Sequence, residues 1–308
     1  LCHCRLLVFA EINVNHKQAA VTKNGKPYEN IILQDKTGTI DAKVWEPNNP
    51  GIGDYDALDY IEVYGEVNSF QGVLQVSVKR IRVCKEEEYD PGEYLPVSSK
   101  SINGMYQELL ELIGSMEDPY LKRLLEVFFV EDQEFAKAFK NSSAAKTVHH
   151  GFVGGLLEHT LCVTKLCDYY CGAYTILKRD LLLAAAMCHD IGKTKEISPF
   201  PQNDYTDDGQ LLGHIVMGSQ MVAEKAAMIQ GFPHVLLSQL QHCILAHHGK
   251  YEFGSPKIPA LIEALALNYA DDTDAKLETF KEILENNREN TGWLGYNRLF
   301  ESNLRGTK

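Results

Sequence analysis

The chain has 308 residues, 44% hydrophobic and 23% charged, so it is long enough for two globular domains with ordinary cores. No uninterrupted apolar run reaches the ~18 residues of a membrane-spanning helix, which argues against a membrane protein. The net charge of −12 argues against indiscriminate nucleic-acid binding, which needs a basic face. The excess negative charge lies beyond residue 83, because residues 1–83 hold nine Lys/Arg against ten Asp/Glu.

The segment from residue 28 to residue 83 has the pattern of short β-strands. Val, Ile, Tyr and Trp alternate with polar residues in YENIILQD (28–35), TIDAKVWE (39–46), DYIEVYGEV (59–67) and GVLQVSVKRIRV (72–83). Turn-forming residues separate these runs, and LQDKTGTIDAKVW is typical of a hairpin. We therefore predict a small closed barrel within residues 1–83, followed by an acidic, proline-containing linker at residues 84–100.

From residue 101 to residue 308 the hydrophobic period becomes helical, which predicts an all-α domain. Gly172, Gly231 and Gly249 follow expected helix ends, where a left-handed cap is common. The loops expected at 195–210 and 249–259 follow groups of polar residues. The expected helices cover residues 102–115, 119–129, 132–140, 154–171, 179–190, 211–230, 234–248 and 259–286.

The eight cysteines do not have the spacing of a small disulfide framework. Cys162, Cys167 and Cys171 lie in an apolar helical stretch, so we interpret them as reduced core residues. The first ten residues lack the basic start and the cleavage site of a signal peptide. Together these features predict a cytoplasmic protein.

Histidines are concentrated in the helical half, where nine of the eleven lie between residues 149 and 248. A single buried histidine is usually a hydrogen-bonded core residue. Here five predicted helices each bring a His or an Asp to one core, which favours a metal site over unrelated structural histidines. The candidate ligands are His159, His189, Asp190, His214, His247, His248 and Asp271.

The motif MCHDIGK (187–193) raises the question of how a carboxylate is tolerated at the end of a fully apolar helix. Imidazole and carboxylate together suit Mn, Fe, Co, Ni or Zn, and six or seven such ligands are enough for two ions. Asp190 could bridge two ions with its two oxygens, and this would compensate for its burial. A pair of ions activates water and holds both oxygens of a phosphoryl displacement.

Four basic residues are candidates for contact with a substrate phosphate. Lys193 follows Asp190 by one turn, and it either meets a phosphate oxygen or is a cation at a helix C-terminus. We assign a catalytic role to Asp190, and also to Lys193 if it contacts a phosphate oxygen. His149 and His150 either contact phosphate or cap the following helix. Lys250, in the loop after the His-His pair, is a further phosphate candidate.

The order His159, His189-Asp190 and Asp271 on helices resembles the HD-domain metal-dependent phosphohydrolases. His214 and either His247 or His248 match the additional ligands of dinuclear members. The Gly-Tyr-Pro signature of cyclic-dinucleotide phosphodiesterases is missing, because YEFGSPKIP follows AHHGK. This difference argues against hydrolysis of cyclic di-GMP.

Two further stretches narrow the resemblance. NGKPYENIILQDKTGTIDAKVW (24–45) resembles nucleic-acid-binding OB-folds, and HHGFVGGLLEHT (149–160) with AHHGKYEFGSPK (246–257) is similar to YhaM-type 3′-5′ exoribonucleases. This resemblance covers about residues 20–280 and implies a multi-domain β + α protein, with a small N-terminal OB-fold β-barrel followed by an all-α HD-domain helical bundle. Its metal core would lie at about residues 149–286. The family implies a manganese-favouring hydrolase that trims single-stranded RNA, and often DNA, from the 3′ end.

OB-folds hold single strands with stacking aromatic rings and with cations that contact the backbone. Each aromatic residue taken alone is more typical of core packing, whereas the domain as a whole favours binding. The candidates on the expected strands are Tyr28, Lys43, Trp45, Tyr64, Phe70, Lys79, Arg80 and Arg82.

The leading hypothesis is a metal-dependent 3′-5′ exonuclease that releases nucleoside 5′-monophosphates. A second hypothesis is a phosphohydrolase of small or cyclic nucleotides, with the barrel as a regulatory module. A third is a nucleic-acid-binding protein whose metal site is only structural. Activity on labelled oligonucleotides compared with free nucleotides separates the first two, and metal-dependent turnover excludes the third.

Overall fold

The computed structural model describes residues 6–22, 24–35, 38–57, 59–70, 73–85, 88–89, 95, 97–146, 150–200 and 202–307, with side chains from residue 12 onward. The second of its two compact units comprises Ser98–Ser198 and Asp204–Lys308, and the first contains the N-terminal barrel. Among the described residues, no helix is both long and apolar enough to cross a membrane. The six described cysteines are free. Of the three predicted core residues, Cys167 is buried, whereas Cys162 and Cys171 are only half-buried.

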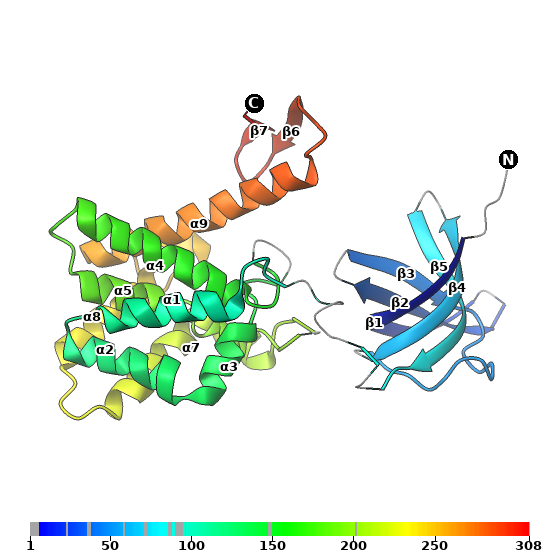
Figure 1. The fold of residues 1–308 in the computed structure, drawn as a ribbon, viewed down its shortest axis with the longest axis horizontal. Coiled ribbons are helices and arrows are strands. Elements are labelled where there is room, and N and C mark those ends of the chain that lie inside the picture. The colour runs from blue at the N-terminus through cyan, green and yellow to red at the C-terminus, as the bar shows by residue number, and fades with distance from the viewer. Residues whose placement is uncertain are drawn as a thin grey trace. The chain divides into compact units, whose positions relative to one another are not determined.

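The N-terminal unit is a closed five-stranded barrel, shown in blue to cyan in Figure 1. β1 closes it by pairing antiparallel with both β2 and β4, and β3 pairs in parallel with β5. The strand order β1-β2-β3-β5-β4 is that of an OB-fold, so the predicted fold class is confirmed. The strands are β1 (Leu6–Val21), β2 (Pro27–Asp35), β3 (Gly38–Val44), β4 (Tyr60–Phe70) and β5 (Val73–Val83).

Sequence patterns missed β1. A register shift between Val14 and His16 interrupts its alternation, so the strand does not keep a simple period of two. A second irregularity follows Tyr64, at Gly65, where a Cβ atom would lie 2.7 Å from the carbonyl oxygen of Ser77. Only glycine permits this close approach of β4 and β5.

The helical unit contains α1 (Ile102–Gly114), α2 (Pro119–Glu126), a π-helical turn (Val127–Glu131), α3 (Gln133–Asn141), α4 (Gly155–Ala173) and α5 (Arg179–Cys188). It continues with α6 (Lys193–Glu196), α7 (Asp207–Ala227), α8 (His234–Ala246), a 3₁₀ turn (Tyr251–Phe253), α9 (Ile262–Asn286) and a hairpin of β6 (Trp293–Asn297) and β7 (Ser302–Arg305). In Figure 1 this hairpin follows the long helix α9, drawn in orange.

Three local predictions were wrong, and one element was not predicted. The predicted loop at 195–210 contains the end of α6 and the start of α7, where the Thr206 hydroxyl accepts a hydrogen bond from the backbone N–H of Gly209. Gly172 lies inside α4, whereas Gly231 and Gly249 have the positive φ expected of caps. The helix predicted at 119–129 changes to a π-helical turn at Val127, and the hairpin after α9 was not predicted.

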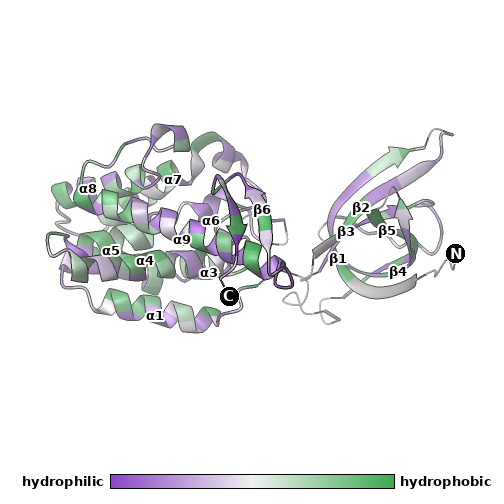
Figure 2. Ribbon diagram, turned by 90° about the horizontal axis from the view of Figure 1, so that it is seen from above, coloured by the Kyte–Doolittle hydropathy of each residue, from purple (hydrophilic) through white to green (hydrophobic). Residues whose placement is uncertain are grey.

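Helix α5 lies at the centre of the helical core. All eight residues from Leu181 to Cys188 are buried, and the helix contacts α2, α4, α8 and α9. Figure 2 shows its hydrophobic colour among helices of mixed character. A helix that is apolar on every side needs such surroundings, and here they place the end of α5 inside the protein.

Candidate metal centre

The buried end of α5 carries His189 and Asp190, which are 0% and 2% exposed. The turn that follows packs tightly against α7. A Cβ atom on Gly192 would lie 2.1 Å from the carbonyl oxygen of His214, so glycine is needed here. This contact brings the end of α5 next to the α7 histidine.

The two carboxylate oxygens of Asp190 face two different groups of histidines. Oδ2 lies 3.5 Å from Nε2 of His159 and 3.3 Å from Nε2 of His189. Oδ1 lies 3.4 Å from Nε2 of His214 and 3.8 Å from Nε2 of His247. A carboxylate with one oxygen in each of two nitrogen clusters has the arrangement that a bridge between two cations requires.

The first cluster joins α4, the end of α5 and α9. Nε2 of His159 lies 3.2 Å from Nε2 of His189 and 3.1 Å from Oδ1 of Asp271. Nε2 of His189 lies 3.9 Å from the same Asp271 oxygen. Nitrogen and oxygen atoms converging in this way can share one metal ion.

The second cluster joins α7 to the end of α8. Ring nitrogens of His214, His247 and His248 lie within 4.8 Å of one another. The two neighbouring histidines at the end of α8 therefore both face His214, so this geometry does not choose between them as ligands. The candidate ligands predicted from the sequence all lie in these two clusters or, for Asp190, between them.

Three polar atoms at this centre have no hydrogen-bond partner among the described residues. They are Oδ1 of Asp190, Nε2 of His214 and Nε2 of His247, and all three are buried. An unsatisfied buried polar atom costs about 1–3 kcal/mol, so three that converge would be expensive without a ligand. A cation with affinity for nitrogen and carboxylate oxygen satisfies all three, and the residues therefore fit a divalent transition metal.

Hydrogen bonds on the opposite ring nitrogens orient the histidines. Nδ1 of His189 donates to the carbonyl oxygen of Ala186, and Nδ1 of His247 donates to that of Ile244, each at 2.7 Å. Nδ1 of His248 likewise lies 2.9 Å from the Phe253 carbonyl oxygen. These bonds occupy the Nδ1 atoms, so Nε2 is the ring nitrogen that each histidine could offer to a metal.

Two carboxylates orient the remaining two histidines, and the sequence analysis missed both. Oδ2 of Asp274 lies 2.7 Å from Nδ1 of His159, and Oε1 of Glu196 lies 3.0 Å from Nδ1 of His214. Glu196 also accepts the backbone N–H of His214 at 3.0 Å. The spacing held a weak signal, because Asp274 follows Asp271 by three residues and so lies on the same helical face.

The site keeps its carboxylates ionised despite burial. Burial raises the pKa of Asp190, but Lys193 and His189 outweigh it and hold that pKa well below the usual range. Burial lowers the pKa of His159, but hydrogen bonds to Asp271 and Asp274 raise it to about 10. The centre thus attracts positive charge in the place where a metal is proposed.

Lys193 contacts the carboxylate of Asp190. Its Nζ lies 2.7 Å from Oδ2 of Asp190, and the residue begins α6 instead of ending a longer helix. Because α6 has only four residues, Lys193 also lies in its last turn, so both interpretations of Lys193 stay predictions. The ion pair places the ammonium group at the edge of the candidate metal centre.

The other phosphate candidates lie in different surroundings. His150 is 1% exposed, its Nε2 lies 3.1 Å from Oδ2 of Asp274, and its side chain does not cap α4. His149 lies outside the described residues. Lys250 is exposed, pairs with Glu252 at 3.3 Å, and lines a groove of about 750 Å³ together with His248 and Asp271.

The barrel places several predicted contact residues on one outer face. The rings of Tyr28 on β2 and Trp45, just after β3, stack with centroids 5.2 Å apart, and Trp45 is 46% exposed. Lys43 forms a hydrogen bond to Asn30 on the neighbouring strand. The parallel ladder of β3 and β5 brings the exposed Lys79 close to this face.

The remaining candidates lie on β4 and β5. Tyr64 and Arg80 line a hollow of about 360 Å³ on the barrel surface. Arg82 lines the same hollow, but its guanidinium is paired with Glu62 and Glu88 at 2.9 and 2.7 Å. Phe70 is 61% exposed at the far end of β4, so it does not share the hollow.

This arrangement of helices and ligands defines the class of protein. Residues 156–276, which include all the candidate metal ligands, match the HD domain family. The barrel is similar to the second OB-fold domain of replication protein A from Methanococcus maripaludis, with 24% identity, coverage of 27% of this chain and 85% of that chain, and a TM-score of 0.21.

Relatives that span both units identify the family. The chain is 34% identical over 268 residues to the 3′-5′ exoribonuclease YhaM of Geobacillus sp. (strain WCH70), covering 86% of this chain and 81% of that protein. It is 35% identical over 266 residues to the 3′-5′ exoribonuclease YhaM of Bacillus subtilis (strain 168), covering 86% and 83%. The chain therefore belongs to the YhaM family of 3′-5′ exoribonucleases, and the predicted family is confirmed.

Proposed function

We propose that this protein is a two-metal exoribonuclease that shortens single-stranded RNA from the 3′ end and releases nucleoside 5′-monophosphates. The observation that carries the proposal is the position of Asp190, whose two oxygens face separate histidine clusters in a chain of the YhaM family. Manganese is the proposed metal, with Fe, Co, Ni and Zn compatible with the same ligand types. We keep the prediction of a cytoplasmic protein.

The residues proposed to hold the two ions divide between the clusters. His159, His189 and Asp271 would hold one ion, His214 with His247 or His248 the other, and Asp190 would contact both. When bound, such ions activate water and neutralise the charge of a phosphodiester. Lys193 holds Asp190 in place through its ion pair, and its ammonium group is proposed to attract a phosphate oxygen at the edge of the site.

We propose that the barrel holds the unpaired strand, with residues 1–83 as the binding domain, 84–100 as a linker and 101–308 as the catalytic domain. The stacked pair Tyr28–Trp45 offers an aromatic surface, and Lys43 and Lys79 are the nearby cations. Stacking and backbone contacts use groups that RNA and DNA share, so the proposal extends to single-stranded DNA. Trp45→Ala should weaken oligonucleotide binding by about 1–3 kcal/mol, whereas Val21→Ala, also exposed, should not.

The decisive experiment follows single-stranded RNA labelled at either end, incubated with added manganese and resolved by size. The wild-type protein should release the 3′ label at once as a mononucleotide and shorten the 5′-labelled strand progressively. Asp190→Ala should abolish hydrolysis, while the control Asp208→Ala, at an exposed position in the first turn of α7, should remain active. Hydrolysis of free or cyclic nucleotides without degradation of RNA would overturn the proposal.

A further inference from the structure

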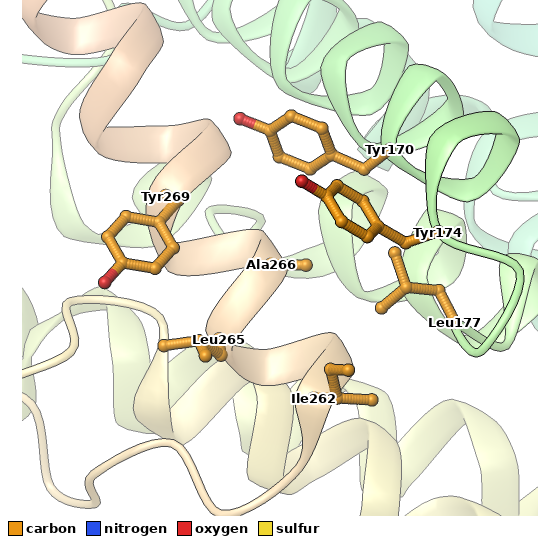
Figure 3. Close-up of a pocket in the computed structure, with 7 residues that line it drawn as sticks. All are labelled: Tyr170, Tyr174, Leu177, Ile262, Leu265, Ala266 and Tyr269. Atoms are coloured by element: carbon orange, nitrogen blue, oxygen red, sulfur yellow. The ribbon is translucent and has the colours of Figure 1, made fainter.

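A second cavity lies beside the metal centre, between the end of α4 and the start of α9. It has a volume of about 370 Å³ and an almost wholly apolar lining. Figure 3 shows Tyr170 and Tyr174 on one side and Tyr269 on the other, with Ala266 between them. The lining residues are Tyr170, Tyr174, Leu177, Ile262, Leu265, Ala266 and Tyr269.

Two of the three aromatic rings of this pocket are exposed to solvent. Tyr174 is 63% exposed and Tyr269 is 59% exposed, and the aliphatic residues Ile262 and Leu265 are 43% and 44% exposed. A cluster of exposed apolar side chains on a soluble domain usually marks a binding surface. None of the lining residues carries a formal charge, so the pocket suits a flat, uncharged group.

The pocket adjoins the groove of the candidate metal centre. Leu265 and Tyr269 line both cavities, and the groove also contains His248 and Asp271. Leu265, Tyr269 and Asp271 all lie on α9. Ile262, at the far end of the pocket, is nine residues before Asp271, or roughly 13 Å along the helix axis. A ligand held at the metal centre can therefore extend into the pocket without leaving the protein surface.

We infer that this pocket is a nucleobase subsite, which stacks the unpaired base next to the scissile linkage. The inference rests on the proposed function, and it names the part of the substrate that this cavity recognises. A nucleotide combines a flat apolar base with a charged phosphate, and the two cavities divide in the same way. The pocket offers tyrosine rings, while the charged side chains that line the groove are Lys250, Lys276, Asp272 and the candidate metal ligand Asp271. Lys250 pairs with Glu252, and Lys276 pairs with Asp272.

The character of the pocket also predicts its selectivity. Stacking on aromatic rings tolerates every base, because each base has a flat π face. The lining contains no charged side chain that would select one base by a directional contact. A base that is paired in a duplex cannot enter, since its faces are covered by neighbouring base pairs. The subsite should therefore accept any sequence but only unpaired ends.

The test compares protein and substrate changes in one cycle, using the full chain with manganese. Tyr174→Ala and Tyr269→Ala remove the rings, and abasic residues at the last two positions of an oligoribonucleotide remove the bases. Each change alone should lower kcat/KM about fivefold to a hundredfold, as expected for loss of one stacked base. Made together, the two changes should cost no more than one of them, because they break the same contact.

Two kinds of control make this cycle specific. Tyr169→Ala removes a 73% exposed ring from α4, outside the pocket. It should leave kcat/KM unchanged on both the normal and the abasic strand. Tyr174→Phe and Tyr269→Phe keep the stacking surface and should retain the wild-type discrimination between normal and abasic ends. Because both tyrosines are largely exposed, the alanine variants should fold, which thermal unfolding can verify.

The outcomes separate this inference from the proposed function. If the losses in kcat/KM from the Tyr→Ala variants and from the abasic ends add, or if Tyr→Ala costs the same on normal and abasic strands, no base occupies the pocket. The proposed exoribonuclease activity would stand in that case. Loss of a dimer in light scattering, without any change in the cycle, would assign the pocket to a second copy of the chain and overturn the inference. A wild-type protein that cleaves no RNA would overturn both.

Discussion

Asp274 offers a test of how the metal centre is oriented, because it acts through a neighbouring histidine. Its Oδ2 atom lies 2.7 Å from Nδ1 of His159 and 3.1 Å from Nε2 of His150, and the residue is buried. Asp274→Asn keeps the size of the side chain but removes its charge. The remaining amide oxygen accepts a hydrogen bond less strongly, so Nε2 of His159 becomes a weaker and less well oriented ligand.

Loss of such an orienting carboxylate typically costs 10–100-fold in metal affinity or activity, or about 1.4–2.7 kcal/mol. Calorimetric titration with manganese should show two ions per wild-type chain. In Asp274→Asn one of the two affinities should fall by this factor, and the other, which depends on the His214 cluster, should be retained. Glu285→Gln, an exposed carboxylate later on α9, is the matched control and should bind both ions normally.

Unchanged affinities and unchanged RNA hydrolysis in a folded Asp274→Asn variant would refute this reasoning. Equal weakening of both ions would also contradict it, because the geometry connects Asp274 directly to only one cluster. Circular dichroism and urea unfolding should accompany the titration, so that a loss of structure is not mistaken for a loss of ligand orientation.

Three further predictions concern stability and substrate. Leu182→Ala removes a fully buried side chain from α5 and should lower the free energy of unfolding in urea by about 2–5 kcal/mol, whereas Leu211→Ala, at an 80% exposed position, should change it little. The hydrogen bonds from Lys225 and from the Phe135 N–H lower the pKa of Asp132, so the stability that Asp132 contributes is present at neutral pH and is lost as the pH falls through its folded-state pKa. Asp132→Ala should therefore lower the free energy of unfolding by about 1 kcal/mol at pH 7 and by less in acid. An equal loss at both pH values would contradict this role of Asp132. Digestion of a 5′-labelled RNA hairpin with a 3′ overhang should stop near the stem, and immediate cleavage within the stem would contradict a platform for unpaired bases.

The sequence predicted the features that depend on local patterns. The buried α5, the polar pair His189-Asp190 at its end and the helices that carry His159 and Asp271 each follow from a run of neighbouring residues. The strands from β2 to β5 follow from alternation and turns in the same way. These signals need no knowledge of distant contacts, so the sequence could predict the fold class and the clustering of the candidate ligands.

The missed features depend on contacts between distant segments. Glu196 and Asp274 are carboxylates on helices with many others, and only the packed structure shows that they hold His214 and His159. His150 likewise gave no sign that it would be buried against Asp274 and not exposed to substrate. The pocket beside α9 required α4 to pack against it, which brings Tyr174 opposite Tyr269.

The central claim is that Asp190 bridges two metal ions, and a crystal structure of the full chain soaked in manganese tests it most directly. Anomalous difference density should show two ions roughly 3.5–4 Å apart. One should lie among His159, His189 and Asp271, and the other beside His214 and His247, with one oxygen of Asp190 on each. A single ion at full manganese occupancy, or two ions that do not share Asp190, would contradict the account.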